Sequence, residues 1–382
     1  MELKEGYKQT EVGVIPEDWR IKPLSAVAFF TNGKAHEQFI DDNGDYIVVN
    51  SKFISTEGDV FKNSSVCICP LKKGDITMVM SDIPNGKALA KCFIIPKDNK
   101  YTLNQRICSL STEISEKRFL AYILNRNKYY LAFDSGTGQT NLKKNDVIGC
   151  PIPLPPTKDE QTAIATALSD ADALIQSLEK LIAKKQNIKQ GAMQELLKPK
   201  EGWVVKKLGE ICEINMGQSP SSSNYNASGV GLPLVQGNSD IADRKTIIRN
   251  YTSQITKRCN NGDIIMSVRA PVGEIAIATF DACIGRGVCA ISYSNAFLYH
   301  YLIFIEPQWA KHSTGSTFDS VNSDTIWALE IDTPPPPEQT RIATILSDMD
   351  AEIATLETKL AKYKQVKQGM MQELLTGRTR LV

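Results

Sequence analysis

The chain has 382 residues, of which 42% are apolar and 23% charged, and its formal net charge is +1 at pH 7. These values are typical of a globular protein with two or three domains, and the near-zero charge by itself gives no support for binding a polyanion. No apolar stretch approaches the roughly 18 residues that span a bilayer, and the first residues lack the apolar core of a signal peptide. We therefore expect a cytoplasmic protein with no membrane partner.

Residues 1–156 have the pattern of a strand-rich domain. Short apolar runs such as YIVVN, DITMVM and CFIIP are bounded by Gly, Pro, Asn and Asp, as strands usually are. The stretch EKRFLAYILNRNKYYLAF predicts one helix near the end of the domain. The run PIPLPP then marks a stiff boundary, because proline continues neither a helix nor a strand ladder. This pattern predicts an α+β domain.

A long helix is predicted over residues 157–198. Thr157 is followed three residues later by Glu160, which is the capping-box pattern of a helix start. From Ile164 to Leu196, seam residues recur at alternating steps of four and three, which is typical of a coiled coil. We interpret Lys189, which interrupts this seam, as a solvated position near its end.

The remainder of the chain repeats the same unit. Residues 338–375 match residues 160–197 at a constant offset, with 24 of 38 positions identical, and Lys367 is the counterpart of Lys189. Residues 199–335 repeat the strand-rich pattern of the first domain, and residues 336–382 contain the second helix. The duplication predicts two pseudo-two-fold-related domains, separated by two long helices that pair as an antiparallel coiled coil.

The sequence contains no motif for covalent chemistry. Phosphate loops of the GxxxxGK[ST] and GxGxxG kinds, the GxSxG elbow and the tetrapeptide of amino-methyltransferases are absent. The three histidines, His36, His300 and His312, lack metal-ligand spacing, and the nine cysteines are scattered, so we interpret them as incidental histidines and free thiols. We expect no metal site, and we predict that the chain is not itself an enzyme.

Several motifs together resemble the DNA-specificity subunit of type I restriction–modification systems. They are the opening YKQTEVGVIPEDWRIKPL, the proline-to-Glu-Gln entry of each helix, the GTGQTN and GSTFDS loops, and the terminal MQELLTGRTRLV. The resemblance covers essentially the whole chain. It implies that each domain is a target recognition domain for one part of a split sequence in double-stranded DNA. The domains differ in their middle parts, which predicts an asymmetric target.

The resemblance also implies partners and their cofactors. The helices would set the gap between half-sites and dock two methyltransferase subunits, which carry S-adenosylmethionine, while restriction subunits would add ATP- and Mg²⁺-dependent functions. We expect no cofactor in this chain. Identical residues outside the seam predict the docking faces, namely Gln190, Gly191, Gln194 and Glu195 on the first helix and Gln368, Gly369, Gln372 and Glu373 on the second.

Candidate DNA contacts are loop residues of the types that read base edges. In the first domain they are Lys34, Asn50, Lys52, Asn85, Lys87, Gln105, Arg106, Gln139, Asn141 and Lys143. In the second domain they are Gln218, Gln236, Asn238, Arg244, Arg269, Arg286 and Ser316. We expect Arg106 and Arg286 to occupy matching places in the duplication, where a buried structural ion pair is the rival interpretation.

Two other function classes remain as alternatives. A structural scaffold would bind the partner subunits without discriminating DNA sequences. A stand-alone DNA-acting enzyme with a cryptic site would be active without partners, and its coiled coil would only hold the two halves together.

Overall fold

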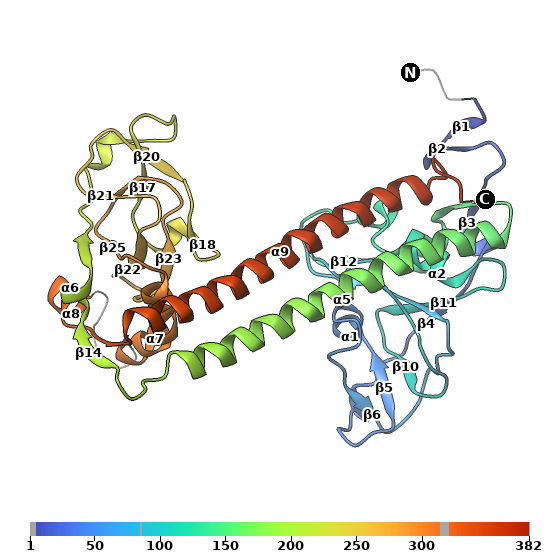
Figure 1. Ribbon diagram of the computed structural model, residues 1–382. Helices are drawn as coiled ribbons and strands as arrows, with labels where there is room; N and C mark the ends of the chain where they lie inside the picture. Colours follow the sequence, from blue (N-terminus) through green and yellow to red (C-terminus); the bar gives the residue numbers. More distant parts are fainter. Residues whose placement is uncertain (1–4, 85, 314–320, 382) are drawn as a thin grey trace. The chain divides into compact units, whose positions relative to one another are not determined.

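The computed structural model describes residues 5–84, 86–313 and 321–381. By internal packing the chain divides into two units, residues 1–178 with 360–382, and residues 179–359. Each unit contains one globular domain and a segment of each long helix (Figure 1). The α+β class predicted from the sequence is confirmed.

The first domain is built on small, mostly antiparallel sheets. A four-stranded sheet has the order β4-β11-β7-β9, and a three-stranded sheet, β10-β5-β6, contains the parallel pair β10–β5. The strands of the first domain are β1 (Tyr7–Thr10), β2 (Gly13–Pro16), β3 (Arg20–Pro23), β4 (Phe29–Asn32), β5 (Tyr46–Val49), β6 (Asn63–Ser64), β7 (Ile76–Val79), β8 (Ser81–Asp82), β9 (Cys92–Ile94), β10 (Tyr101–Leu103), β11 (Ile107–Ser111), β12 (Thr140–Asn141) and β13 (Pro151–Leu154).

The single helix predicted near the end of the first domain is in fact two helices, α2 (Lys117–Leu124) and α3 (Lys128–Leu131). The helix ends where Asn125 takes an extended conformation and Arg126 a φ of +55°, and Asn127 restarts it by accepting a hydrogen bond from the Tyr129 amide at 2.9 Å. The domain also contains α1 (Ser51–Ser55) and α4 (Lys144–Ile148).

The second domain repeats this plan with larger sheets. The six-stranded sheet has the order β15-β25-β22-β23-β19-β18, and the five-stranded sheet has the order β16-β20-β17-β24-β21. The strands of the second domain are β14 (Val204–Lys207), β15 (Glu213–Met216), β16 (Tyr225–Asn226), β17 (Leu232–Val235), β18 (Ile241–Ala242), β19 (Lys245–Thr246), β20 (Asn250–Thr252), β21 (Arg258–Cys259), β22 (Ile264–Ser267), β23 (Ile275–Ile277), β24 (Ala282–Ile284), β25 (Val288–Ser292) and β26 (Glu330–Thr333).

Three helices belong to the second domain alone. They are α6 (Leu208–Ile211), α7 (Phe297–Ser313) and α8 (Ser323–Trp327). Unlike the broken pair in the first domain, α7 is continuous. No helix among the described residues is long and apolar enough to cross a membrane.

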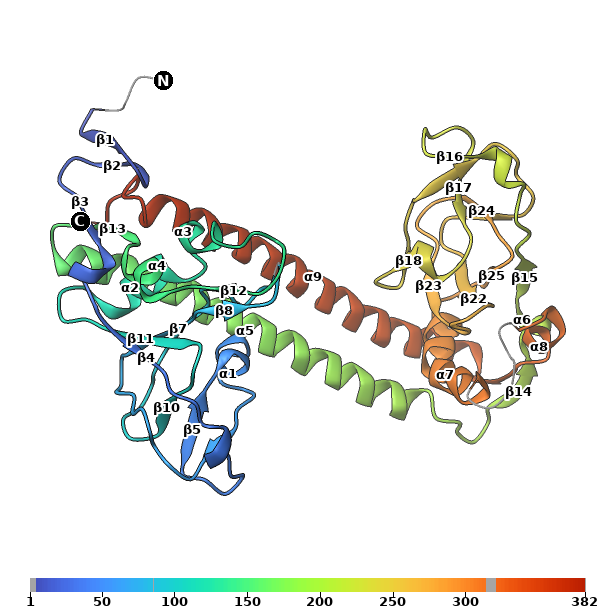
Figure 2. The same ribbon diagram turned by 180° about the vertical axis from the view of Figure 1, so that it is seen from behind.

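The long helices are α5 (Lys158–Leu196) and α9 (Pro336–Leu374), and they pair antiparallel within each unit. In the first unit, the beginning of α5 lies beside the end of α9 (Figures 1 and 2), and Ile164 shares a core with Leu374. In the second unit, Ile342 of α9 shares a core with Met193 near the end of α5. The predicted antiparallel coiled coil is thus confirmed.

The sequence predicted that the two lysines that interrupt the seam are solvated ends. The structure shows that they are not. Lys367 pairs with Asp172 in the first unit, and Lys189 pairs with Asp350 in the second. Each lysine side chain is mostly buried, with an exposed fraction of 23% for Lys367 and 17% for Lys189. Because both partners obey the same offset of 178 residues, the duplication has conserved one interhelical ion pair in two places.

The Glu-Gln pair that opens each long helix joins the helix to its own globular domain. The side-chain oxygen of Gln161 accepts hydrogen bonds from Ser115 Oγ at 2.8 Å and from the Glu116 amide at 2.9 Å. Gln339 likewise accepts from Tyr293 and Asn295. The glutamine of this motif is therefore structural, because its buried side-chain oxygen accepts two hydrogen bonds from the domain and so ties each helix to it.

Candidate nucleic-acid interface and helix faces

Four strand ends that are far apart in the sequence lie side by side in the first domain. They are joined by backbone hydrogen bonds from Gly33 to Ile107 (3.0 Å), Lys34 to Leu103 (3.1 Å), Met80 to Arg106 (2.9 Å) and Leu142 to Met80 (2.8 Å). We call residues 32–34, 80–82, 104–106 and 139–143 the first strip. It brings together six predicted DNA contacts, namely Lys34, Gln105, Arg106, Gln139, Asn141 and Lys143.

The second domain reproduces this framework bond for bond. The corresponding hydrogen bonds run from Gly217 to Val288 (3.1 Å), Gln218 to Ile284 (3.0 Å), Val268 to Gly287 (2.9 Å) and Val321 to Val268 (2.9 Å). We call residues 216–218, 267–269, 285–287 and 321–322 the second strip. It contains three predicted contacts, Gln218, Arg269 and Arg286, and all three side chains are exposed.

The matched hydrogen bonds correct the expected equivalence of two arginines. Because Arg106 and Gly287 accept equivalent bonds, Arg286 corresponds to Gln105 and not to Arg106. The buried-ion-pair interpretation is also wrong, since Arg106 and Arg286 are both exposed. Arg106 has a φ of +67°, a backbone conformation that is uncommon for residues other than glycine and that often marks functional positions.

A chain of side-chain hydrogen bonds organises one end of the first strip. The Gln139 amide donates to Ser81 Oγ at 2.8 Å, and Ser81 Oγ donates to the Asn141 side-chain oxygen at 2.6 Å. This arrangement holds two amide side chains, both exposed, on neighbouring segments. Ser81 was not among the predicted residues, because only the pairing of β8 with β12 brings it to this place.

The other first-domain candidates have mixed roles. Asn50 is half-buried and caps α1 by accepting from the Phe53 amide at 2.9 Å, while Gln105, although exposed, donates to Glu37 at 2.6 Å. Lys52, Lys87 and Lys143 are exposed, and Lys143 stands at the start of α4. Asn85 lies outside the described residues.

In the second domain, the predicted DNA contacts that the structure describes outside the second strip are partly buried or bonded within the domain. Asn238 is half-buried and donates to Glu274. Arg244 pairs with Glu306 and donates to the Ile275 carbonyl at 3.1 Å, so its guanidinium holds the domain together. Gln236 is half-buried at the end of β17. Ser316 lies outside the described residues.

Charge distinguishes the equivalent outer parts of the two domains. Residues 36–69 contain six acidic and two basic residues, histidine excluded, whereas the equivalent residues 220–257 contain two acidic and four basic residues. A polyanion is repelled by the first set and attracted by the second. In the first domain, a nucleic acid is therefore better accommodated along the strip than on residues 36–69.

The predicted docking residues all lie on exposed faces of the long helices. Gln190, Gly191, Gln194 and Glu195 are exposed on α5, and Gln368, Gly369, Gln372 and Glu373 are exposed on α9. At Gly191 and Gly369, a Cβ atom would meet no other atom within 4 Å. Glycine inside a helix costs about 1 kcal/mol relative to alanine, and no intramolecular contact requires it at either position.

Buried histidines and cysteines have structural surroundings. His36 is hydrogen-bonded to Thr102 Oγ1 at 2.7 Å, and His300 to Ser347 Oγ at 3.1 Å; the side chain of His312 lies outside the described residues. Burial raises the pKa of the Cys108 and Cys289 thiols to about 12, which disfavours the reactive thiolate. Within the described ranges, no group of three or more His, Cys, Asp or Glu residues is arranged to hold a metal ion.

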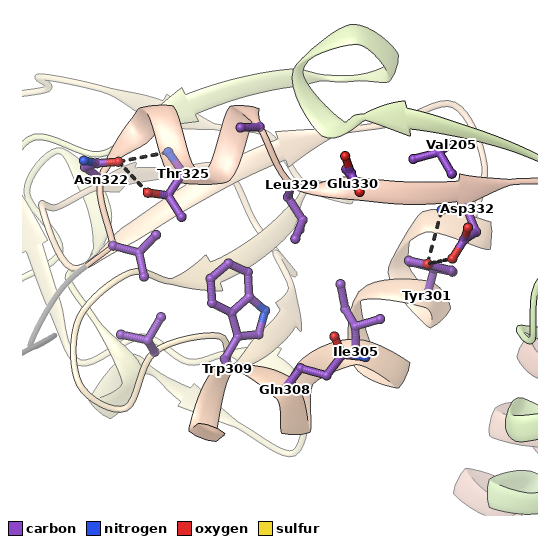
Figure 3. A pocket seen from close by; sticks show the side chains of 13 residues that line it. Val205, Tyr301, Ile305, Gln308, Trp309, Asn322, Thr325, Leu329, Glu330 and Asp332 are labelled. Atoms are coloured by element: carbon purple, nitrogen blue, oxygen red, sulfur yellow. Dashed lines mark hydrogen bonds between the residues drawn. The ribbon is translucent and has the colours of Figure 1, made fainter. Parts of the chain in front are cut away.

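A pocket of about 870 Å³ lies in the second domain beside α7 and α8 (Figure 3). Its wall is largely apolar and includes Ile305 and Trp309. Two pairs of polar residues in the wall bind each other, with Tyr301 OH donating to Asp332 at 2.8 Å and the Thr325 amide donating to Asn322 at 2.9 Å, while Gln308 and Glu330 are drawn without a bond to another lining residue. The Tyr301–Asp332 and Asn322–Thr325 pairs are thus held by partners within the domain.

Comparison with known proteins identifies two copies of one family model. The model of the type I restriction modification DNA specificity domain matches residues 16–190 and again residues 200–366. A specificity subunit of the type I restriction enzyme MjaX from Methanocaldococcus jannaschii is 30% identical, covering 99% of this chain and 97% of the relative. The MjaVIII specificity subunit from the same organism is 22% identical with the same coverage.

Solved structures show the same fold. A chain from a structural study of complex assembly and conformational transition in the type I restriction–modification system is 25% identical and superposes with a TM-score of 0.62, covering 96% of this chain and 99% of that one. The specificity subunit from M. genitalium superposes with a TM-score of 0.66 over 98% of both chains, at 16% identity.

Proposed function

The chain belongs to the type I restriction–modification DNA specificity family, and we propose that it reads an asymmetric, bipartite target with one half-site per domain. As a specificity subunit it recognises DNA rather than catalysing a reaction, consistent with the specificity-subunit names of its relatives. The finer proposal concerns how the duplicated chain produces two different readings and where its partners bind.

One observation supports asymmetric reading above all: two matched frameworks present different side chains. Where the first strip has Lys34, Ser81 and Gln105, the second has Gln218, Arg269 and Arg286 at the equivalent positions. Arginine and lysine favour guanine, and glutamine favours adenine, when they read the major-groove edges of bases. Exchanging these residue types on a common framework would therefore change the bases that are preferred.

The near-zero net charge does not conflict with this proposal, because the cations are concentrated locally. Lys34, Lys87, Arg106 and Lys143 are exposed on or next to the first strip, and Arg269 and Arg286 on the second. Phosphate contacts from such residues position the protein, and base contacts then select the sequence. Methyltransferase subunits around the duplex would supply further cationic surface.

Docking of methyltransferase subunits is supported by the conserved faces of the two helices. Packing explains identity along the seam, but Gln190, Gly191 and Gln194 and their counterparts are exposed. A glycine within a helix, with open space beside it, suits the close approach of another backbone. Two matched faces favour two copies of one partner, and restriction subunits would join the complex through them.

The experiment that tests this function is a genome-wide map of N6-methyladenine in cells that express the cognate methyltransferase with and without the chain. We expect a split, non-palindromic motif that requires the chain. A palindromic motif would contradict asymmetric reading. An unchanged methylation pattern would contradict recognition by this chain and favour a scaffold.

A further inference from the structure

One side chain beside the first strip differs in chemistry from its polar surroundings. Ile83 directly follows β8, and its exposed fraction is 67%. A single exposed aliphatic residue is ordinary on a protein surface. Ile83 is unusual because of its location. Ser81 and Asn141 lie on the adjoining pair of strands, Gln139 directly precedes that pair, and Lys87 stands at the other end of the turn.

The turn that carries Ile83 is held tightly from within. The Asp82 carboxylate accepts hydrogen bonds from the amides of Ile83 (2.9 Å), Ala88 (2.7 Å) and Leu89 (3.0 Å). The Gly86 amide donates to the Ile83 carbonyl at 2.9 Å. These bonds close the turn around one carboxylate, and they fix the backbone of Ile83 without covering its side chain.

Arg126 fastens the same turn to the body of the domain. Its guanidinium donates to the carbonyls of Gly86 and Leu89, each at 3.2 Å. Only glycine fits at position 86 in this turn, because the Cβ atom of any other residue would collide with the Asp82 carboxylate. These bonds constrain the backbone that carries Ile83, which reduces the backbone entropy that would otherwise be lost on binding.

We propose that Ile83 is an apolar wedge that inserts at a base step of the half-site read by the first domain. The proposal rests on the function proposed above, which places DNA along the first strip. Rigid aliphatic side chains inserted between base pairs unstack them and kink the duplex. Flanking lysine and amide groups would bind phosphates and base edges, while Ile83 would make specificity depend on how easily that step unstacks.

The test uses the complex of this chain with its methyltransferase subunits, bound to duplexes that carry 2-aminopurine at successive positions of both half-sites. Positions next to the methylated adenine are left out, because methyltransferases extrude their target base. With the wild-type chain we expect a fluorescence rise at one step of the first half-site. Ile83→Ser abolishes that rise and weakens binding about tenfold, in line with the lost apolar burial. Ile83→Leu retains both.

Phe29→Ser is the matched control. Phe29 is even more exposed, at 76%, but it pairs with Ser111 at the end of β4 away from the first strip. We expect this variant to leave the fluorescence and the affinity unchanged. Specific binding by the wild type without a fluorescence rise in the first half-site, or a rise that survives Ile83→Ser, would overturn the wedge but not the proposed function. Failure of the wild-type complex to prefer its target would refute both.

Discussion

The strips and the long helices come from the same duplication, yet the two copies have diverged very differently. The helices retain 24 identical residues of 38, including the exposed Gly191 and Gly369. The strips retain their backbone hydrogen bonds but exchange their side chains, as Gln105 and Arg286 illustrate. A surface that binds two copies of one partner must stay alike, whereas surfaces that read different half-sites must differ. The contrast therefore distinguishes docking faces from reading faces.

We expect the strongest effects from substitutions in the strips, each of which should alter base preference in one half-site only. Arg286→Ala should weaken specific DNA binding by about 1–3 kcal/mol and relax base preference in the second half-site only, whereas Gln105→Ala should act on the first. Competition binding against duplexes that are randomised in one half-site measures both the affinity and the base preference at that half-site. Arg244→Ala is the control, since Arg244 pairs with Glu306; its loss should lower stability without shifting preference between bases.

Acid lability should differ between the two units. Burial lowers the pKa of His300 to about 4, whereas the equivalent position beside α5 is Tyr122, whose pKa is raised to about 12, chiefly by burial. Because the pKa of His300 is lower in the folded state, protonation favours the unfolded state. The folded state therefore has its full stability above about pH 6.5, the pKa in the unfolded chain, and loses stability as the pH falls toward 4. At pH 5 the loss should be about 2 kcal/mol.

Urea unfolding at pH 7 and pH 5 measures this loss. The variant His300→Tyr installs the residue of the other copy, and it should remove most of the pH dependence between 6.5 and 4. If the free energy of unfolding of the variant depended on pH as strongly as that of the wild type, a group other than His300 would be responsible for the loss of stability.

The helix glycines should separate docking from stability. Gly191→Leu and Gly369→Leu should each raise helix stability by about 0.5–1 kcal/mol, because glycine is a poor helix former and open space lies beside it. Each should nevertheless weaken binding of one methyltransferase subunit roughly tenfold, because the close approach is blocked. Calorimetry and analytical ultracentrifugation provide the two measurements. Ser177→Leu, exposed elsewhere on α5, should leave association unchanged.

The smallest expected effect concerns the repeated ion pair. Lys367→Met removes the ammonium group that faces Asp172 and should destabilise the first unit by about 1 kcal/mol, because Asp172 is 33% exposed and still accepts a hydrogen bond from Tyr122 OH at 2.7 Å. Lys189→Met should do the same in the second unit through Asp350. Reversing a pair, as in Lys367→Asp with Asp172→Lys, should recover part of the loss. Chemical denaturation of the single and double variants gives the coupling energy directly.

Sequence patterns predicted the long-range plan well and the local contacts poorly. The period of the seam and the constant offset specify which helix faces meet, because burial of apolar side chains dominates that choice. The same seam could not show that Lys189 faces Asp350, since the partner lies far away in the chain. Likewise, the helix predicted after residue 116 breaks where Asn125 is extended and Arg126 has a positive φ, which no apolar period reveals.

The candidate site shows the same division. Residue type and loop position identified several exposed members of both strips, including Arg106 and Arg286, but not their register. The similar motifs around Arg106 and Arg286 suggested that these two arginines are equivalent. The hydrogen bonds show instead that Arg286 is equivalent to the residue before Arg106. Ser81 and Ile83 were missed because their significance depends on strand pairing and on the turn around Asp82.

If one framework reads two half-sites through its side chains, exchanging those side chains as a set should exchange the bases that are read, and a chimaera can show this. In this chimaera, residues 20–154 are replaced by residues 204–333, so that both domains carry the second strip. N6-methyladenine mapping of cells that express the chimaera with the methyltransferase should then reveal a motif with the same bases on both sides of its gap. A motif that still contains the original first half-site would show that the strips do not select the bases.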